Sequence, residues 1–452
     1  MPATLAAPPG PKGTPLAGVL KPFNDRRLEY LLECARIYGP VCALRLGPRR
    51  TLLVSDPDLI EHVLVTDAKN YIKHFGARMY SPLLGNGLVT SEGDFWLRQR
   101  RLAQPAFLKN RLPKYAPAMT ELAEEMMKSW EPGQRVDVAE EMTRLTGSIA
   151  LRTLFGADAI RDQEAYYTAH FTALAIIHNR FRRLIQWPDW VPLPSNRRLK
   201  RALAHLDGII HGFIRQGRAR SDPGDNLLSM LLRAQDEDGS RMTDAQLRDE
   251  AMTLFLAGHE TTALTLSWAW YLLAQNPDVE TRLAAEWQQV LGGRPPTADD
   301  VPRLPYTEHV VMEAMRIYPP VYLIGREPIV DVELGGYHVR KGTTIFFSQW
   351  VNHRDPKYFS DPETFRPERW ADGLAKRIPK YAYYPFGGGP RVCVGNTFAM
   401  MEAVLLLAAM GRRWRFTLEP DPKVEPWPTI TLRPRHGVPT VLMPRVTSSV
   451  GL

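Results

Sequence analysis

The chain has 452 residues, of which 44% are hydrophobic and 23% are charged, and its formal net charge is +8. This composition excludes a disordered protein and favours a folded one with a large apolar core. The sequence has no run of about 18 apolar residues, which excludes a membrane-spanning helix, and no compact basic run with interleaved aromatic residues, which argues against nucleic-acid binding.

The first half of the chain begins with a Pro-rich lead-in, residues 1–20. It has no basic start followed by an apolar core, so it is not a secretory signal. A short helix is predicted at Leu28–Tyr38, and two apolar runs around Gly47-Pro48 predict a β-hairpin. A Pro-rich loop is predicted at Trp187–Arg198 within a mainly helical region. The clearest predicted helices are Tyr115–Trp130, Glu140–Phe155, Leu199–Arg220, Thr243–Asn276 and Asp278–Val290.

The second half mixes strands, irregular structure and one long helix. Turn residues and β-branched runs predict strands within residues 331–348. Residues 352–370 are so rich in Pro, Asp and Asn that they predict an ordered segment without regular elements. A helix is expected from just after Cys393 to about Arg412, followed by a last β-rich stretch. There is no internal repeat and no linker-like change in composition, so we expect one mainly α unit with small β-sheets, spanning residues 1–452.

The three cysteines show no pairing pattern. Cys34, Cys42 and Cys393 have neither the spacing of a disulfide framework nor that of a zinc site, which indicates a reducing, cytoplasmic compartment. Cys393 follows Gly387-Gly388-Gly389, where the backbone can approach a flat group closely. Backbone N–H groups and the following helix start favour an anion there, and a buried thiolate needs a cation such as a metal. A single axial thiolate on haem iron fits; the alternative is an inert structural cysteine.

Five residues around this cysteine form a recognisable pattern. Phe386, Gly389, Arg391, Cys393 and Gly395 stand as F-x-x-G-x-R-x-C-x-G, which resembles the haem-binding signature of the cytochrome P-450 family. The resemblance implies haem b as cofactor, Cys393 as the proximal iron ligand, Phe386 beside the thiolate, Gly395 at the turn into the helix and Arg391 on a haem propionate. It also implies the family's fold, a large helical domain with a smaller β-rich region, in a single catalytic domain with no fused reductase.

Two segments between residues 306 and 370 match the same family in order. Glu313 and Arg316 lie three residues apart on one face of a predicted helix and resemble the family's E-x-x-R pair. The segment FRPERW supplies Arg369, which the resemblance makes the third member of a buried charge network near the cysteine loop. Loss of Glu313 is then expected to abolish haem incorporation. Without the resemblance, solvated surface pairs would be the simpler interpretation.

Three further residues resemble contacts to the haem propionates. Trp96 and Arg100 lie four residues apart on one helix face, where an indole N–H and a guanidinium suit a carboxylate. They resemble the family's W-x-x-x-R, although an exposed basic helix face is an alternative. Arg326, in LIGREP, is similar to another propionate-binding arginine of the family.

The segment LFLAGHETTALTLSW interrupts a buried apolar helix with Gly258, His259, Glu260, Thr261 and Thr262. Such residues are unfavourable in a helix interior, and hydroxyls that bond back to the preceding turn predict a widened turn there. The segment resembles the family's A-G-x-E-T, which implies that Thr261 holds dioxygen and a water while Glu260 relays protons. The alternative is a kinked core helix.

The resemblance implies a monooxygenase that inserts one atom of dioxygen into an apolar substrate. Two electrons would come from a separate ferredoxin or flavodoxin with its reductase, so that NAD(P)H acts only indirectly. A basic segment around residues 97–115 is expected to dock this acidic partner, or else to be an ordinary solvated face. Its basic residues are Arg98, Arg101, Lys109, Arg111 and Lys114. A monomer is expected.

The substrate prediction rests on the Pro-rich start and the AGHETT helix. Both resemble the fatty-acid-oxidising, membrane-type branch of the family without its anchor, so a fatty acid is expected. Arg49 and Arg50 are candidates for binding its carboxylate, or are solvated turn residues. The alternatives are a terpenoid or steroid hydroxylase, a peroxide-driven hydroxylase, an oxygen-independent isomerase or dehydratase, and a haem-thiolate sensor without activity. The expected pocket walls are Tyr71–Val89, Phe171–Trp190, Leu254–Ala257 and Val321–Ile324.

Overall fold

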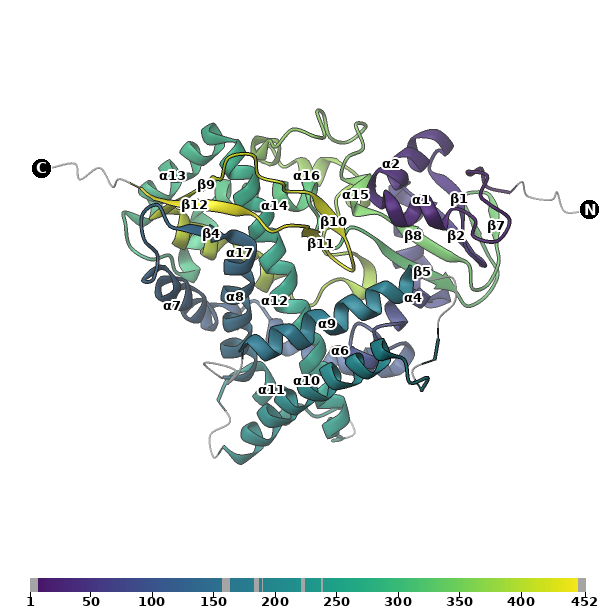
Figure 1. The fold of residues 1–452 in the computed structure, drawn as a ribbon, viewed down its shortest axis with the longest axis horizontal. Helices are drawn as coiled ribbons and strands as arrows, with labels where there is room; N and C mark the ends of the chain where they lie inside the picture. The colour runs from purple at the N-terminus through teal and green to yellow at the C-terminus, as the bar shows by residue number, and fades with distance from the viewer. Residues whose placement is uncertain are drawn as a thin grey trace, which may run out of the picture.

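The computed structural model describes residues 7–156, 163–182, 187–188, 190–220, 224–236 and 239–445. Most long helices lie to the left and below in Figure 1, and the largest sheet lies to the right, beside the N-terminus. The helices are α1 Leu20–Asp25, α2 Arg27–Tyr38, α3 Pro57–Glu61, α4 Phe75–Arg78, α5 Ser81–Leu84, α6 Gly93–Ala103, α7 Ala116–Met127, α8 Val138–Ala150, α9 Gln163–Phe181, α10 Pro194–Ala219, α11 Leu227–Arg233, α12 Asp244–Gln275, α13 Pro277–Leu291, α14 Pro305–Ile317, α15 Gln349–Asn352, α16 Leu374–Arg377 and α17 Asn396–Gly411.

The strands are short and come mostly from the two ends of the chain. They are β1 Val41–Leu46, β2 Arg49–Val54, β3 Tyr71–Lys73, β4 Arg135–Asp137, β5 Ile324–Pro328, β6 Val332–Leu334, β7 Tyr337–Val339, β8 Thr344–Phe347, β9 Trp414–Leu418, β10 Pro426–Pro428, β11 Leu432–Pro434 and β12 Pro439–Pro444. The largest sheet has the order β1-β2-β8-β5-β3, in which β2 and β8 are parallel and the other pairs antiparallel. The predicted fold class, mainly α with small sheets, is confirmed.

The predicted hairpin at residues 41–54 is present as β1 and β2, with Leu46 opposite Arg49 across the turn. Alternation of buried and exposed residues in β1 places one face on the core, as expected for a half-buried strand. The strands predicted within 331–348 are β6, β7 and β8, and residues 352–370 are mostly irregular apart from a short 3₁₀ helix at Pro367–Trp370. The sequence therefore located the sheets at both ends of the chain.

Helix α12 is the central helix of the fold and packs against α8, α10, α14 and α17. A capping box fixes its start, because Thr243 accepts from the Gln246 backbone and the Gln246 side chain accepts from the Thr243 backbone. Its residues are buried on most sides, which is why the segment lacks a polar face. The widened turn predicted around Gly258 is wrong: α12 is continuously α-helical across this stretch.

Several predicted helix ends shift for identifiable reasons. Helix α10 begins at Pro194, so the predicted loop at Trp187–Arg198 is too long; Pro is favoured in a first helical turn because it lacks an N–H. The helix predicted at Glu140–Phe155 is α8 followed by a π-helical turn, Leu151–Phe155, which ends at Gly156 with φ 63°. Residues 183–186 and 189 of the predicted loop and pocket wall lie outside the described residues.

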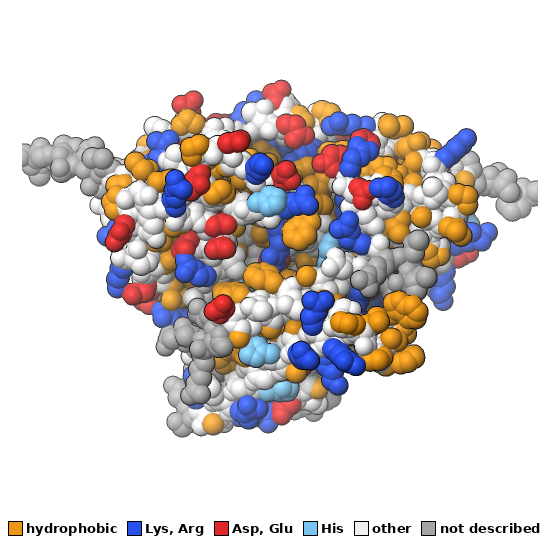
Figure 2. All heavy atoms as spheres, in the orientation of Figure 1, with side chains coloured by type: hydrophobic (Ala, Val, Ile, Leu, Met, Phe, Trp, Pro, Cys, Tyr) orange, Lys and Arg blue, Asp and Glu red, His pale blue; other side chains and the backbone are white. Residues whose placement is uncertain are grey.

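The surface carries charges of both signs. Figure 2 shows basic and acidic side chains interspersed over most of the face drawn, with apolar atoms among them. Within the described ranges, no helix combines the length and the apolar character needed to cross a lipid bilayer.

Candidate active site

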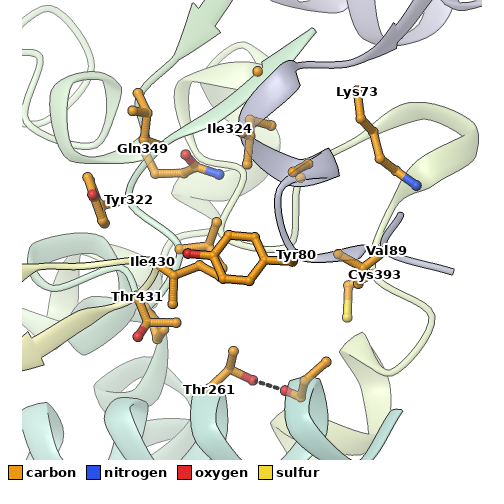
Figure 3. A pocket seen from close by; sticks show the side chains of 18 of the residues that line it. Lys73, Tyr80, Val89, Thr261, Tyr322, Ile324, Gln349, Cys393, Ile430 and Thr431 are labelled. Atoms are coloured by element: carbon orange, nitrogen blue, oxygen red, sulfur yellow. Dashed lines mark hydrogen bonds between the residues drawn. The ribbon is translucent and has the colours of Figure 1, made fainter. Parts of the chain in front are cut away.

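A cavity of about 740 Å³ lies between α12, the cysteine loop and the edge of the largest sheet. This volume is within the range of small-molecule sites. Figure 3 shows Cys393 and Thr261 on the walls of this cavity, Tyr80 in its middle and Lys73 at one side. Much of the wall is apolar and includes Leu83, Leu84, Leu174, Leu254, Leu256 and Ile324. Each of the four predicted pocket-wall segments contributes lining residues among the described part of the chain.

The loop that carries Cys393 is held in shape by its glycines and by backbone bonds. Gly389 has φ 68°, and a Cβ there would lie 1.8 Å from the Leu64 carbonyl oxygen, so no other residue fits without movement. The sequence predicted that these glycines let the loop backbone approach another group closely. At Gly389 that group is the backbone of Leu64, in the π-helical turn His62–Thr66. The backbone N–H of Cys393 donates to the Phe386 carbonyl at 3.0 Å, which closes the loop. Phe386 itself lines the cavity.

The sulfur of Cys393 is accessible from the cavity. Burial raises the pKa of the Cys393 thiol, while a backbone hydrogen bond from Gly395 and the charge of Arg100 act in the opposite direction. Gly395 is the residue directly before α17 and has φ −94°, a conformation open to other residues. The backbone donor at the sulfur is the kind of contact that the sequence predicted for a thiolate.

Four cations line the cavity near this loop: Lys73, Arg100, Arg326 and Arg391. Burial, followed by repulsion from Arg391, lowers the pKa of Lys73 to about 7. The same two causes lower the pKa of Arg326 to about 10. Glu92 pairs with Arg391. Positive charge therefore exceeds negative charge at this end of the cavity, which favours an anionic ligand.

The predicted haem contacts are brought together here. The Arg391 guanidinium lies 4.2 Å from the centre of the Trp96 ring, and Arg100 donates to the Val392 carbonyl at 2.7 Å. Arg326 lies on β5, opposite Lys73 of β3. Lys73 and Glu92 were missed by the sequence analysis, because neither belongs to a recognisable motif. A single thiol facing an apolar cavity with surplus buried cations fits haem, whose propionates are anionic and whose iron accepts a thiolate.

Glu313, Arg316 and Arg369 are brought together as well. The carboxylate of Glu313 accepts from Arg316 at 2.9 and 3.0 Å and from Arg369 at 2.9 Å. Trp370 Nε1 and the Arg366 backbone N–H donate to the same carboxylate at 2.9 and 3.0 Å. Glu313 and Arg316 are fully buried, so the alternative of solvated surface pairs is wrong.

Glu260 and Thr261 occupy adjacent positions on α12 but face different partners. The Thr261 hydroxyl donates to the Ala257 carbonyl at 2.8 Å, the back-bond that the sequence predicted, and both residues line the cavity. Glu260 accepts from Thr431 at 2.5 Å and lies 2.7 Å from Arg433. Its other oxygen lies 3.6 Å from Nε2 of His170.

The charge state of Glu260 follows from these contacts. Burial alone would raise the pKa of Glu260, but Arg433, His170 and Thr431 outweigh burial and hold this pKa well below its usual range. Glu260 is therefore a carboxylate at neutral pH. Arg433, Thr431 and His170 were not predicted, since they come from distant parts of the chain and carry no local pattern.

The remaining predicted residues lie at the periphery. Arg49 lines the cavity and stacks over Phe75 at 3.7 Å, whereas Arg50 is not among the described lining residues. In the basic segment, Arg98 pairs with Asp236 at 2.9 Å. Arg111 and Lys114 both pair with Asp225, at 3.5 and 2.5 Å. Arg98, Arg111 and Lys114 are thus already engaged within the chain.

Comparison with known proteins defines the class. Residues 8–441 match the family model described as cytochrome P-450. The chain is 40% identical over 432 residues to cyclooctatin synthase of Streptomyces melanosporofaciens, covering 93% of this chain and 92% of that protein. It is 36% identical to cyclooctat-9-en-7-ol 5-monooxygenase of the same organism, covering 93% of each. It is 34% identical to pentalenene oxygenase of Streptomyces avermitilis, covering 94% of each.

The chain therefore belongs to the cytochrome P-450 family, whose members are haem proteins. The predicted family and the predicted enzyme class, a monooxygenase, are confirmed.

Proposed function

We propose that this protein is a haem-thiolate monooxygenase that inserts one atom of dioxygen into a cyclic terpenoid. The observation that carries the proposal is the Cys393 thiol at the wall of an apolar cavity that Thr261 and several buried cations also line. Family membership supplies the class of reaction, and the relatives supply the class of substrate.

Cys393 would ligate the haem iron, and the propionates would be bound by Arg100, Arg326, Arg391 and Trp96, with Lys73 as an additional donor. Haem b with a thiolate ligand supplies the activation of dioxygen when it is bound. The protein's own contribution is to bind and orient the substrate, to exclude water and to deliver protons.

Proton delivery is assigned to Thr261 and Glu260. The Thr261 hydroxyl is held at the cavity by its bond to the Ala257 carbonyl, and this leaves its oxygen lone pairs available. Glu260 is charged, lies beside His170 and Arg433 and lines the same cavity as Thr261, so we propose that it accepts a proton and delivers it into the cavity towards Thr261. Dioxygen is the co-substrate.

The substrate proposal departs from the fatty-acid prediction. Relatives that cover most of the chain are named for cyclooctatin, cyclooctat-9-en-7-ol and pentalenene. The cationic side chain best placed for a fatty-acid carboxylate, Arg49, already stacks on Phe75. The apolar wall suits a compact polycyclic skeleton at least as well as a long chain.

Electrons are proposed to come from a separate ferredoxin or flavodoxin with its reductase, in the cytoplasm. The basic residues proposed to dock this acidic partner are Arg98, Arg101, Lys109, Arg111 and Lys114. Rates of reduction should fall as salt increases if charge guides docking. Reduction rates that do not change with salt would contradict the proposal that this basic segment docks the redox partner.

Two measurements test the proposal. The first is the absorbance of the dithionite-reduced holoprotein before and after carbon monoxide, where a strongly red-shifted Soret band indicates a thiolate ligand. The second is product analysis with a surrogate ferredoxin and reductase, supplied with cyclic terpenoids and fatty acids in parallel. A Soret band typical of imidazole ligation, or oxidation of fatty acids alone, would contradict the proposal. Turnover with peroxide but not with the redox pair would favour a peroxide-driven hydroxylase.

A further inference from the structure

One polar side chain on the cavity wall has no role in the contacts described above. Gln349 is the first residue of α15 and follows β8 closely. Its side chain is fully buried and lines the cavity. Neither the amide nitrogen nor the amide oxygen has a hydrogen-bond partner among the described residues. A buried amide in this state lacks the hydrogen bonds that it would make in water, which costs free energy unless a ligand replaces them.

Gln349 differs from the other unsatisfied polar group at this wall. Among the described lining residues, His170 and Gln349 have buried side-chain polar atoms without a hydrogen bond. His170 lies 3.6 Å from the Glu260 carboxylate and belongs to that charged cluster. Gln349 lies between Tyr322 and Ile324 in the view of Figure 3, and its amide makes no hydrogen bond with Glu260 among the described contacts.

The backbone around Gln349 is fixed by hydrogen bonds. The Ser348 hydroxyl donates to the Tyr322 carbonyl at 2.9 Å and accepts from the Val351 N–H at 3.3 Å. The Gln349 carbonyl accepts from the His353 N–H at 2.9 Å. The backbone that carries the amide is therefore held rigidly at a junction between a strand and a helix. The amide itself has no accessible surface in this structure, so a ligand in the cavity reaches it only when a neighbouring side chain moves.

We infer that Gln349 binds a hydroxyl group that the substrate already carries. A primary amide offers a donor and an acceptor side by side, and a hydroxyl both donates and accepts, so the two match. The inference rests on the proposed function and narrows its substrate from a terpene hydrocarbon to a terpenoid alcohol. One relative has a name that itself specifies an alcohol, cyclooctat-9-en-7-ol.

The position of Gln349 also restricts where oxidation occurs. Figure 3 shows Gln349 and Cys393 well separated, on opposite sides of the Tyr80 ring. A hydroxyl held at Gln349 therefore belongs to a part of the skeleton remote from the reacting carbon. One C–H bond becomes C–OH, the second oxygen atom leaves as water, and the redox partner supplies two electrons while solvent supplies two protons. The product is a diol with distant oxygens, and an earlier hydration or hydroxylation must supply the substrate.

The test compares α-cedrene, a tricyclic hydrocarbon, with cedrol, the tertiary alcohol that results when water is added across its double bond, on the holoprotein. Dissociation constants are measured by equilibrium dialysis and by the change of the Soret band. Without a polar partner in the cavity the alcohol would bind more weakly, because its hydroxyl would lose its hydrogen bonds to water and gain none from the protein. We expect the wild type to bind cedrol about tenfold more tightly than α-cedrene.

Two variants assign this preference to one residue. In Gln349→Met the preference for cedrol should be lost or reversed, while the affinity for α-cedrene is kept or rises. Gln99→Met is the matched control, because Gln99 is also fully buried with both amide atoms unsatisfied, but it lies on α6 outside the described lining residues. Its ratio of affinities should remain that of the wild type.

The failures can be told apart. Equal affinities of the wild type for both compounds, or an unchanged ratio in Gln349→Met, overturn the inference and leave the proposed function standing. Binding of neither terpenoid, with binding of a fatty acid in the same assay, overturns the proposed function and the inference together. The wild-type ratio needs no variant, so the inference is tested even when Gln349→Met does not fold.

Discussion

Glu313 and Glu260 are both buried glutamates paired with arginine, but they differ in how fully their carboxylate oxygens are hydrogen-bonded. Five N–H donors from Arg316, Arg366, Arg369 and Trp370 surround the Glu313 carboxylate at 2.9–3.0 Å. One oxygen of Glu260 accepts a hydrogen bond from Thr431 and forms an ion pair with Arg433, whereas its second oxygen lies 3.6 Å from His170.

The difference extends to the neighbours of each carboxylate. Among the described residues, both ring nitrogens of His170 and Nε2 of His259 lack a hydrogen-bond partner, and Glu260 lines the cavity. A fully matched buried network specifies one arrangement, and a partly matched one leaves alternatives of similar energy. The Glu313 cluster is suited to holding the fold, and the Glu260 cluster is suited to moving a proton. The predictions below test this division.

The largest effect is expected for Glu313→Ala. It leaves two buried guanidiniums without their anion, which costs about 3–5 kcal/mol of folding free energy. We expect expression of protein without haem, measured as the ratio of Soret to protein absorbance, and a strongly lowered denaturation midpoint.

The control for this change is Glu33→Ala, which removes an exposed pair with Arg26. Such a pair contributes about 0–1 kcal/mol, so this variant should keep its haem and its stability. Full haem content and wild-type stability in Glu313→Ala would show that the Glu313 cluster is dispensable and would contradict its assignment to holding the fold.

A smaller effect, on turnover and not on folding, is expected for Glu260→Gln. The amide keeps the size of the side chain but cannot relay a proton, so product formation should fall about 100-fold. Haem content and substrate affinity should stay near wild type. Turnover is measured with the surrogate redox pair at saturating substrate.

Arg433→Met is a complementary variant, because it keeps the Glu260 carboxyl group and removes only its ion-pair partner. Without Arg433, burial raises the pKa of Glu260, so the group becomes harder to ionise. We expect a loss of turnover smaller than that of Glu260→Gln, with partial recovery as the pH is raised. Wild-type turnover in both variants would remove Glu260 from the proton path.

The two clusters also differ in how much of each the sequence revealed. Glu313 and Arg316 share one helical turn, and Arg369 stands in a recognisable segment, so a family pattern identified all three. For the Glu260 cluster only α12 was visible, since His170 on α9 and Arg433 on β11 reach it through the fold alone. Lys73 and Glu92 were missed for the same reason, because a single charged residue in a strand or loop has no periodic signal.

The incorrect predictions have physical causes as well. Gly258, Glu260 and Thr261 did not widen α12, because the Thr261 hydroxyl bonds to the Ala257 carbonyl within an intact helix. Such back-bonding is compatible with a regular helix. The low helix propensity of these residues is outweighed by the packing of α12, which is buried on most sides. The start of α10 was placed too late because the Pro-rich segment Trp187–Arg198 was predicted as a loop throughout, although Pro is favoured in a first helical turn.

The smallest effect is expected for a third buried glutamate, Glu402 on α17. Unlike Glu313 and Glu260, Glu402 has no arginine beside it among the described contacts. Burial raises the pKa of Glu402 from 4.5 to about 8, against a hydrogen bond with Thr262 that lowers it. A raised pKa in the folded state favours the protonated carboxyl, so the stability that Glu402 contributes is present below pH 4.5 and is lost as the pH rises towards 8. Glu402→Gln should therefore become progressively more stable relative to wild type as the pH rises from about 5 to about 8, measured by denaturant unfolding. The exposed Glu125→Gln should show no such gain, and a difference between wild type and Glu402→Gln that stays constant with pH would mean that Glu402 remains ionised in the core.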